Sequence, residues 1–135
     1  NLFGAGVQAC CRGPQLYDSP QTKAIVKKWV DFYKEHREVL DSDIVHIRRP
    51  DGKDYDGLLH VNPEGKDKGL IMLYNPLEVP VVKTIKVNLY YTGLSEQAIL
   101  TNQNGEKLSI SLNRDYSINL PIHIPAKSQQ WFVIN

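Results

Sequence analysis

The sequence predicts a mainly β protein: an antiparallel β-sandwich of about eight strands, preceded by one amphipathic α-helix. Two observations predict this architecture. Between residues 19 and 40 apolar side chains recur every three or four positions, whereas after residue 43 they alternate with polar ones. Short groups of turn-forming residues separate the alternating stretches, and no second helical pattern follows. The 135 residues suit a single domain by size.

The composition excludes several classes of function. Sixteen basic residues oppose 15 acidic ones, so we expect no nucleic-acid partner, which would need a clustered basic surface. No apolar run approaches the roughly 20 residues that span a bilayer, so we expect no membrane partner. Two adjacent cysteines, Cys10 and Cys11, are too few for a disulfide framework or a zinc cage. We therefore expect neither a metal nor another cofactor.

The N-terminal stretch, residues 1–18, reads as a short apolar strand or loop followed by a polar loop. It opens at Asn1 without a starting Met or a basic leader, so we expect the true N-terminus upstream. An apolar strand that leads by a loop into a helix is typical of a parallel barrel, where that loop lies on the active-site face. Gln8 and Arg12 are thus candidate substrate-binding residues, and a purely structural loop is the alternative.

The helix is expected to begin at Ser19-Pro20, because Ser can cap a helix and Pro suits its first position. It should continue to about Leu40 with one broad apolar face. Such a face needs a partner surface. We expect the helix to dimerise through this face, to expose it, or to fold it onto the sheet. The face comprises Ile25, Val26, Trp29, Val30, Phe32, Tyr33, His36 and Val39.

The strands are expected at residues 44–49, 56–62, 69–75 and 82–91, followed by a hairpin and two closing strands at 122–124 and 131–134. Asn104-Gly105 favours a two-residue hairpin turn, which would place Ile99 opposite Ile110. A second reversal at 113–115 would place Ile118 opposite Ile110 as well, giving one half-buried meander. The first turn also pairs Thr101 with Leu108. The second turn also pairs Leu112 with Tyr116 and Leu108 with Leu120.

No catalytic residue can be named from the sequence. Glycoside hydrolysis normally needs two facing carboxyl groups, but the acidic residues lie mainly in expected turns or on the solvated helix face. His46 and His60 should lie diagonally on neighbouring strands without an evident third metal ligand. His36 should pack within the helix face, and His123 should face solvent. These acidic residues include Asp51, Asp54, Glu64, Asp67 and Glu106 in turns, Asp31, Glu35 and Glu38 on the helix, and Asp41 and Asp43 after it.

Aromatic residues could form a sugar-stacking platform, with packing in the core or at an interface as the alternative. The candidates are Trp29, Tyr74, Tyr90, Tyr91 and Trp131.

Several segments resemble the C-terminal region of bacterial glycoside-hydrolase-like proteins related to the α-galactosidase group. They include Gly6-Val7-Gln8-Ala9-Cys10, Arg12-Gly13-Pro14, Lys28-Trp29-Val30, Leu40-Asp41-Ser42-Asp43-Ile44, His60-Val61-Asn62-Pro63, Tyr74-Asn75-Pro76-Leu77 and Tyr90-Tyr91-Thr92-Gly93-Leu94. The resemblance spans nearly the whole chain but only the family's tail. It implies that residues 1–40 are the remnant of a preceding (β/α)8 barrel and that residues 41–135 are a C-terminal β-sandwich.

This resemblance implies a non-catalytic domain that packs against and stabilises the catalytic barrel of a glycoside hydrolase. The barrel of the parent chain is then the expected partner, glycans are a second, and homodimerisation through the exposed helix face is a third. A parent of this kind would be secreted or periplasmic if exported. Two alternatives stay open: a carbohydrate-binding module with an aromatic face of Tyr90, Tyr91 and Trp131, and a small enzyme with a histidine-based metal site.

Overall fold

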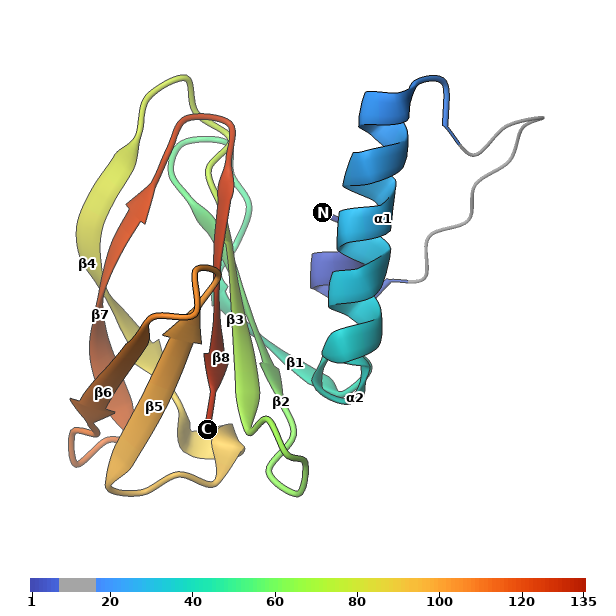
Figure 1. The fold of residues 1–135 in the computed structure, drawn as a ribbon. Helices are drawn as coiled ribbons and strands as arrows, with labels where there is room; N and C mark the ends of the chain where they lie inside the picture. Colours follow the sequence, from blue (N-terminus) through green and yellow to red (C-terminus); the bar gives the residue numbers. More distant parts are fainter. Residues whose placement is uncertain (8–16) are drawn as a thin grey trace.

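The computed structural model describes residues 1–7 and 17–135, and it shows two facing antiparallel sheets with a helix beside them (Figure 1). The mainly β fold with one long helix is therefore confirmed. Its strands are β1 (Asp43–Arg48), β2 (Asp56–Val61), β3 (Gly69–Tyr74), β4 (Val81–Asn88), β5 (Gln97–Asn102), β6 (Lys107–Ser111), β7 (Ser117–Ile124) and β8 (Gln129–Ile134).

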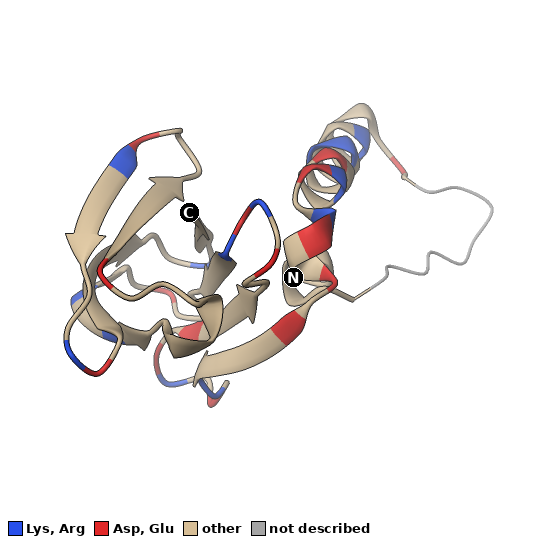
Figure 2. Ribbon diagram, turned by 90° about the horizontal axis from the view of Figure 1, so that it is seen from below, with Lys and Arg blue, Asp and Glu red and all other residues tan. Residues whose placement is uncertain are grey.

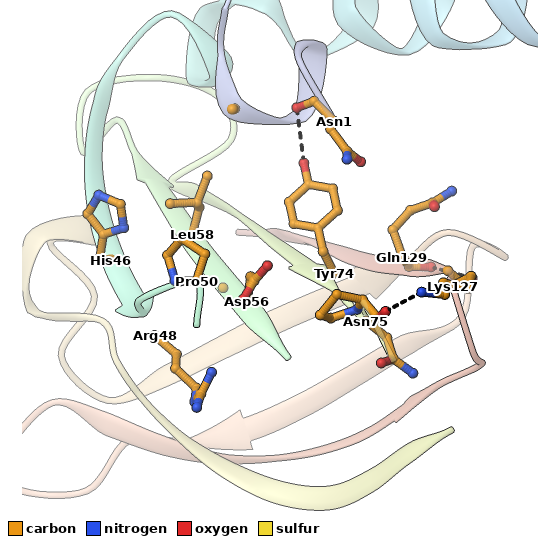
Figure 3. Close-up of a pocket in the computed structure, with 14 residues that line it drawn as sticks. Asn1, His46, Arg48, Pro50, Asp56, Leu58, Tyr74, Asn75, Lys127 and Gln129 are labelled. Carbon is orange, nitrogen blue, oxygen red and sulfur yellow. Dashed lines mark hydrogen bonds between the residues drawn. The ribbon is translucent and has the colours of Figure 1, made fainter. Parts of the chain in front are cut away.

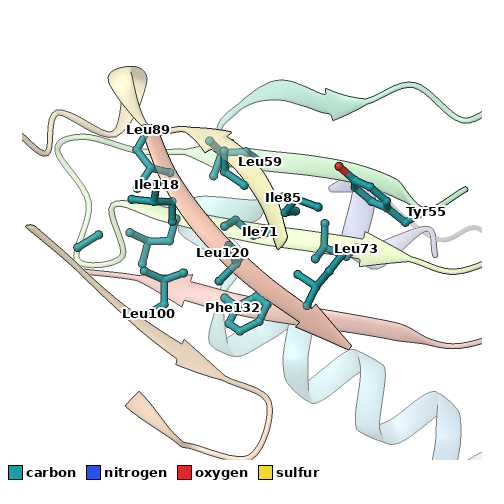
Figure 4. Close-up of a cluster of buried hydrophobic side chains, with 14 of the residues drawn as sticks. Tyr55, Leu59, Ile71, Leu73, Ile85, Leu89, Leu100, Ile118, Leu120 and Phe132 are labelled. Carbon is teal, nitrogen blue, oxygen red and sulfur yellow. The ribbon is translucent and has the colours of Figure 1, made fainter. Parts of the chain in front are cut away.

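The larger sheet has six strands in the order β1-β2-β3-β8-β5-β6, and β4 and β7 pair to form the second layer. Alternate side chains of both sheets point inward, so the buried positions of β4 are Val81, Ile85 and Val87. These residues join a continuous apolar core between the layers (Figure 4). Burial of this core supplies most of the driving force for folding, because each large side chain contributes about 1.5–3 kcal/mol.

The helix begins where the sequence predicts. Helix α1 (Pro20–Glu35) has Pro20 in its first turn, and the Ser19 hydroxyl accepts a hydrogen bond from the Thr22 amide at 3.1 Å. The backbone then departs from helical geometry at His36, and a short helix α2 (Arg37–Leu40) completes the segment. The predicted end near Leu40 is confirmed, with one break that the apolar periodicity did not reveal.

The helix lies on the outer face of the six-stranded sheet, on the side away from β4 and β7 (Figure 1). A second apolar cluster joins Phe32, Val39 and Leu40 to Leu70, Met72 and Val133 of the sheet. The contact involves the C-terminal half of α1, since the side chain of Ile25 remains 59% exposed. The expectation that the helix folds onto the sheet is met for half of its apolar face.

The first residues form a tight turn rather than a strand. Phe3–Ala5 is one turn of 3-10 helix, η1, and Gly6 ends it with a positive φ of 68°. A Cβ atom on Gly6 would lie 2.2 Å from the Leu40 carbonyl oxygen, so only glycine lets this turn approach α2. The continuation of the predicted strand or loop, beyond residue 7, lies outside the described residues.

The hairpin between β5 and β6 has a register one residue away from the prediction. Ala98 faces Ile110 and Leu100 faces Leu108, whereas Ile99 faces Ser109 and points outward. The turn holds three residues rather than two, because the Gly105 amide donates to the Asn102 carbonyl and Gly105 takes φ 81°. A one-residue slip exchanges the two faces of a strand. The predicted pairs Ile99–Ile110 and Thr101–Leu108 were therefore wrong.

The predicted meander was wrong at its second turn. The chain does reverse after β6, with the Tyr116 amide donating to the Asn113 carbonyl. However, β7 then pairs with β4 in the other layer, and β6 is left at the sheet edge. The predicted pairs Leu112–Tyr116, Ile110–Ile118 and Leu108–Leu120 are not formed. Turn signals located the reversal but could not show that it carries the chain between sheets.

Gly105→Ala should lower the free energy of unfolding by about 1 kcal/mol, because an L-residue is strained at this positive φ. A clash is not the cause, since nothing lies within 4 Å of a Cβ atom placed there. Urea unfolding followed by circular dichroism measures the loss. Gln103→Ala, in the same turn, is the control and should change stability by less than about 0.5 kcal/mol. Equal effects of both substitutions would contradict the assigned turn.

Charges of both signs are interspersed along α1 and at the strand ends (Figure 2). This distribution agrees with the net charge of +1 and shows no single-sign stripe on the ribbon. Among the described helices, none is long and apolar enough to cross a membrane.

Candidate functional site

A cavity of about 470 Å³ opens on the outer face of the six-stranded sheet, next to the first residues of the chain (Figure 3). Asp56 and Leu58 of β2 form its floor, and Tyr74 of β3 rises beside them because Tyr74 is the cross-strand partner of Asp56. His46 and Arg48 of the edge strand β1 close one side. The remaining walls are Asn1, Ala5, Pro50, Gly57, Asn75, Pro76, Lys127, Ser128 and Gln129.

Asp56 is the polar centre of this cavity. Its Oδ1 atom is buried and accepts no hydrogen bond from the described residues. Burial raises the pKa of the Asp56 carboxyl above its usual value, and the positive charge of Arg48 opposes the rise. Arg48 itself is engaged elsewhere: it donates to Asp51 at 2.7 and 3.0 Å and to the Tyr55 carbonyl at 2.8 Å. Because Oδ1 is buried, Oδ2 is the carboxylate oxygen that Asp56 presents to a donor entering the cavity.

The opposite wall supplies donors. Burial raises the pKa of Tyr74 to about 12, so its phenol stays protonated at neutral pH and donates to the Asn1 carbonyl at 3.4 Å. Lys127 is committed to the Pro76 carbonyl at 2.7 Å and to Glu78 at 3.0 Å. The side-chain amide of Gln129 makes no hydrogen bond to any residue that the structure describes. Gln129 and Asp56 are thus the polar groups best able to receive a ligand.

The described lining of the cavity can be compared with the groups that break a glycosidic bond. Retaining and inverting hydrolysis both use two carboxyl groups, roughly 5 to 9.5 Å apart across the bond. Among the described residues that line this cavity, Asp56 is the one acid. The arrangement can hold a polar molecule, but a second carboxyl group would have to come from elsewhere.

The two strand histidines serve different purposes. His46 and His60 are diagonal neighbours as predicted, since His46 faces Leu58 and His60 faces Ile44. His46 is exposed at the cavity rim, whereas His60 is fully buried, and its Nε2 donates to the Gly4 carbonyl at 2.8 Å. His60 Nδ1 is buried and has no partner in the described part of the chain. His60 therefore anchors the N-terminal turn to the sheet.

Burial lowers the pKa of His60, while the bond to Gly4 and the charge of Asp41 oppose the decrease. The folded state therefore favours neutral His60, whereas unfolding exposes a histidine that takes up a proton at its ordinary pKa near 6.5. Stability due to this group is complete above about pH 6.5 and is lost as the pH falls. The loss should not exceed about 1.4 kcal/mol per pH unit, the slope for one proton.

Urea unfolding of the native chain and of His60→Gln at several values between pH 7.5 and 5.5 measures this effect. The difference in unfolding free energy between the two proteins should shrink as the pH falls, because the variant lacks the titrating group. His123→Gln, at an exposed position, is the control. A pH-independent difference between native chain and His60→Gln would contradict the assigned role.

The structure separates the predicted aromatic face into two groups. Trp131 packs against Phe32 and His36 beneath α1, at ring distances of 5.1 and 5.6 Å. Tyr90 instead contacts Tyr91 and exposed Tyr116, at 5.3 and 5.2 Å. The prediction that Tyr90, Tyr91 and Trp131 share one binding face was therefore wrong. Trp29 and Tyr74 also pack at the outer cluster, as the alternative of core packing predicted.

Other predicted residues are placed as follows. His36 packs in the helix face and His123 is exposed, as expected. Asp51 and Asp54 are surface charges paired with Arg48 and Lys83. Asp67 differs from the expected solvated turn charge, because it lies half-buried and accepts from His36 Nδ1 at 3.3 Å. The two predicted substrate-binding residues, Gln8 and Arg12, lie outside the described residues.

Sequence reasoning did not select Asp56, Tyr74 or Gln129 as a group. A signal was present: Asp56 has the same strand parity as Leu58 and His60, which places its carboxyl on the same face as a leucine and a histidine. The pairing of β2 with β3 and of β3 with β8 brings Tyr74 and Gln129 beside it. Those pairings were not available from the alternation pattern alone.

No protein-family model and no curated protein matches the sequence. Among solved structures, the chain is similar to the crystal structure of a putative alpha-N-acetylgalactosaminidase from Bacillus halodurans, with a TM-score of 0.52 and 16% sequence identity. The match covers 87% of this chain and 25% of that protein, so the chain spans about a quarter of its length. At this identity the likeness shows a common fold.

Proposed function

We propose that these residues form the non-catalytic C-terminal part of a glycoside hydrolase. In this proposal residues 1–40 complete the end of a catalytic barrel, and the β-sandwich of residues 41–135 packs against that barrel and stabilises it. The half-covered helix carries the proposal. Phe32 is buried against the sheet, while Ile25, two turns earlier on the same apolar face, has no comparable cover.

The structural comparison supports this arrangement. The sandwich alone makes up less than three quarters of the chain, so a match over 87% also takes in part of residues 1–40. The fold of this chain therefore corresponds to a quarter of a protein described as a glycosidase, with part of the helical region included. Asp56 is the one carboxylate among the described residues of the cavity, which supports a role other than bond cleavage.

A carbohydrate-binding module remains the second candidate, because Tyr90, Tyr91 and Tyr116 are exposed together. Their geometry favours it less. Tyr90 meets Tyr91 at 85° and Tyr116 at 78°, so the three rings do not form a flat platform on which a sugar chain could stack.

Ile25→Glu tests the proposed docking face. In the 135-residue chain the substitution should change the unfolding free energy by less than about 0.5 kcal/mol, because Ile25 is exposed. In the longer protein of this proposal, with its barrel, it would place a charge in the barrel contact and should cost several-fold more, about 3 kcal/mol. Thermal unfolding of both proteins provides the comparison.

The control is Gln21→Glu, which makes the same change of charge at an exposed position of α1. It should leave both proteins near their native stability. Sedimentation of the short chain adds a second readout: if the uncovered face drives homodimerisation, Ile25→Glu should give a monomer. Equal, small effects of Ile25→Glu in the short and the longer protein would refute the docking role.

A further inference from the structure

We propose that the cavity around Asp56 binds a single neutral sugar ring, a pyranose, without cleaving it. This function goes beyond the stabilising role proposed above. It places sugar recognition on the outer face of the six-stranded sheet rather than on the exposed tyrosines. The cavity volume of about 470 Å³ lies within the range of small-molecule sites, about 300–1,000 Å³.

The walls of the cavity match the two surfaces of a sugar ring. Pro50, Leu58 and Pro76, with the ring of Tyr74, present carbon to the C–H groups of a pyranose. Asp56 and Gln129 present polar atoms to its hydroxyls. Ligand sites in proteins commonly combine such an apolar lining with a few fixed polar groups.

The charges around the cavity select against ionic ligands. A cation attracted by Asp56 would also meet Arg48 and Lys127, which line the same space. An anion attracted by those two side chains would meet the Asp56 carboxylate, and their charges are already paired with Asp51 and Glu78. A neutral molecule with several hydroxyl groups meets neither repulsion.

The hydrogen-bonding groups suit hydroxyls in particular. Among the described residues no donor reaches the buried Oδ1 of Asp56, so the carboxylate gains from an O–H that reaches its other oxygen, Oδ2. Gln129 can donate and accept, and the Tyr74 hydroxyl, held only weakly by Asn1 at 3.4 Å, can turn toward a ligand. A sugar hydroxyl both donates and accepts, so one ring can satisfy all three groups.

Titration of the ¹⁵N-labelled 135-residue chain with D-galactose, D-glucose and N-acetyl-D-galactosamine tests the proposal by NMR. At least one neutral sugar should cause saturable shifts at the amides of Gly57, Leu58 and Gln129, with a dissociation constant in the millimolar range. D-glucosamine and D-glucuronate, which carry a positive and a negative charge on a similar ring, should bind more weakly than the best neutral sugar.

Asp56→Asn should weaken that binding about tenfold, the effect of losing one hydrogen bond to a charged group. Asp31→Asn is the matched control, because Asp31 is an exposed carboxylate on α1, and it should leave binding unchanged. Gln129→Ala provides an independent variant if Asp56→Asn fails to fold, and it should weaken binding several-fold.

Three results would overturn the sugar site: no saturable shift with any neutral sugar at tens of millimolar, shifts confined to Tyr90, Tyr91 and Tyr116, or stronger binding of the charged sugars. None of these results bears on the docking of α1, which the stability of Ile25→Glu measures separately. Conversely, if Ile25→Glu shows that α1 has no docking partner, saturable sugar binding at Asp56 would still establish the sugar site independently of the accessory role.

Discussion

Leu120→Ala should lower the free energy of unfolding by about 2–5 kcal/mol, the range for removing a large side chain from a packed core. Leu120 lies in β7 opposite Ile85 and is 0% exposed. The second layer consists of β4 and β7, and Leu120 is one of seven buried apolar side chains with which these strands close the core (Figure 4). Truncation leaves a void that two strands cannot easily close.

Urea unfolding followed by tryptophan fluorescence and by circular dichroism measures this loss. The matched control is Val82→Ala on the neighbouring strand of the same layer, where the side chain is 68% exposed. The control should change stability by less than about 0.5 kcal/mol. If both truncations had similar small effects, β4 and β7 would not form a layer of the core.

Asn75→Asp should destabilise the fold by about 3 kcal/mol or more at neutral pH. The buried Asn75 side-chain amide donates to the carbonyls of Val79, Ile124 and Pro125 at 2.8, 3.1 and 2.9 Å. Its Oδ1 accepts from the Leu77 amide at 2.9 Å. One side chain thus joins the end of β3 to the loop before β4 and to the end of β7. In Asn75→Asp a carboxylate oxygen would replace the donating NH2 group. It would face three carbonyl oxygens, none of which can donate a hydrogen bond to it.

The effect should depend on pH in a defined direction. The three carbonyls favour the protonated form of the introduced carboxyl group and raise its pKa in the folded state above the unfolded value of about 3.9. The variant then loses stability as the pH rises from the unfolded-state pKa through the raised folded-state pKa. The loss of unfolding free energy caused by Asn75→Asp should therefore be smaller at pH 4 than at pH 7. Chemical unfolding at both values, with exposed Asn119→Asp as the control, measures it. A pH-independent penalty would contradict the hydrogen-bond network.

Local features of the fold were predictable because local chemistry determines them. Ser19 and Pro20 fix the helix start through capping and a preset φ, and the alternation in residues 82–91 identifies the buried face of β4. The break at His36 was not predictable, since the apolar spacing continues through it. At the break His36 contacts Trp131 and Asp67, which come from distant parts of the chain.

Long-range pairing was the feature that the sequence did not determine. Asn104-Gly105 is compatible with a two-residue turn, but Gly105 closes a three-residue turn, and the register of Ile99 follows that choice. The reversal at 113–116 looks alike in sequence whether the next strand continues the same sheet or crosses to the other. Packing of Ile118 and Leu120 against β4 decides between these outcomes.

The candidate site depends on the same long-range pairing. Asp56 is unremarkable as the first residue of a strand, and its environment becomes special when Tyr74, Gln129 and the N-terminal turn surround it. Helix periodicity did predict that α1 needs a covering surface. It could not show that the sheet covers only the half near Phe32 and leaves Ile25 exposed.

The central claim is that this chain is a scaffold and that the groups that cleave a glycosidic bond lie outside it. Hydrolysis of nitrophenyl glycosides by the purified 135-residue chain tests this claim most directly. Release of nitrophenol from α- and β-linked galactosides, glucosides and N-acetylgalactosaminides should equal that in buffer. Turnover that rises with protein concentration and disappears in Asp56→Asn would show that the chain carries catalytic groups itself, and the accessory role would be wrong.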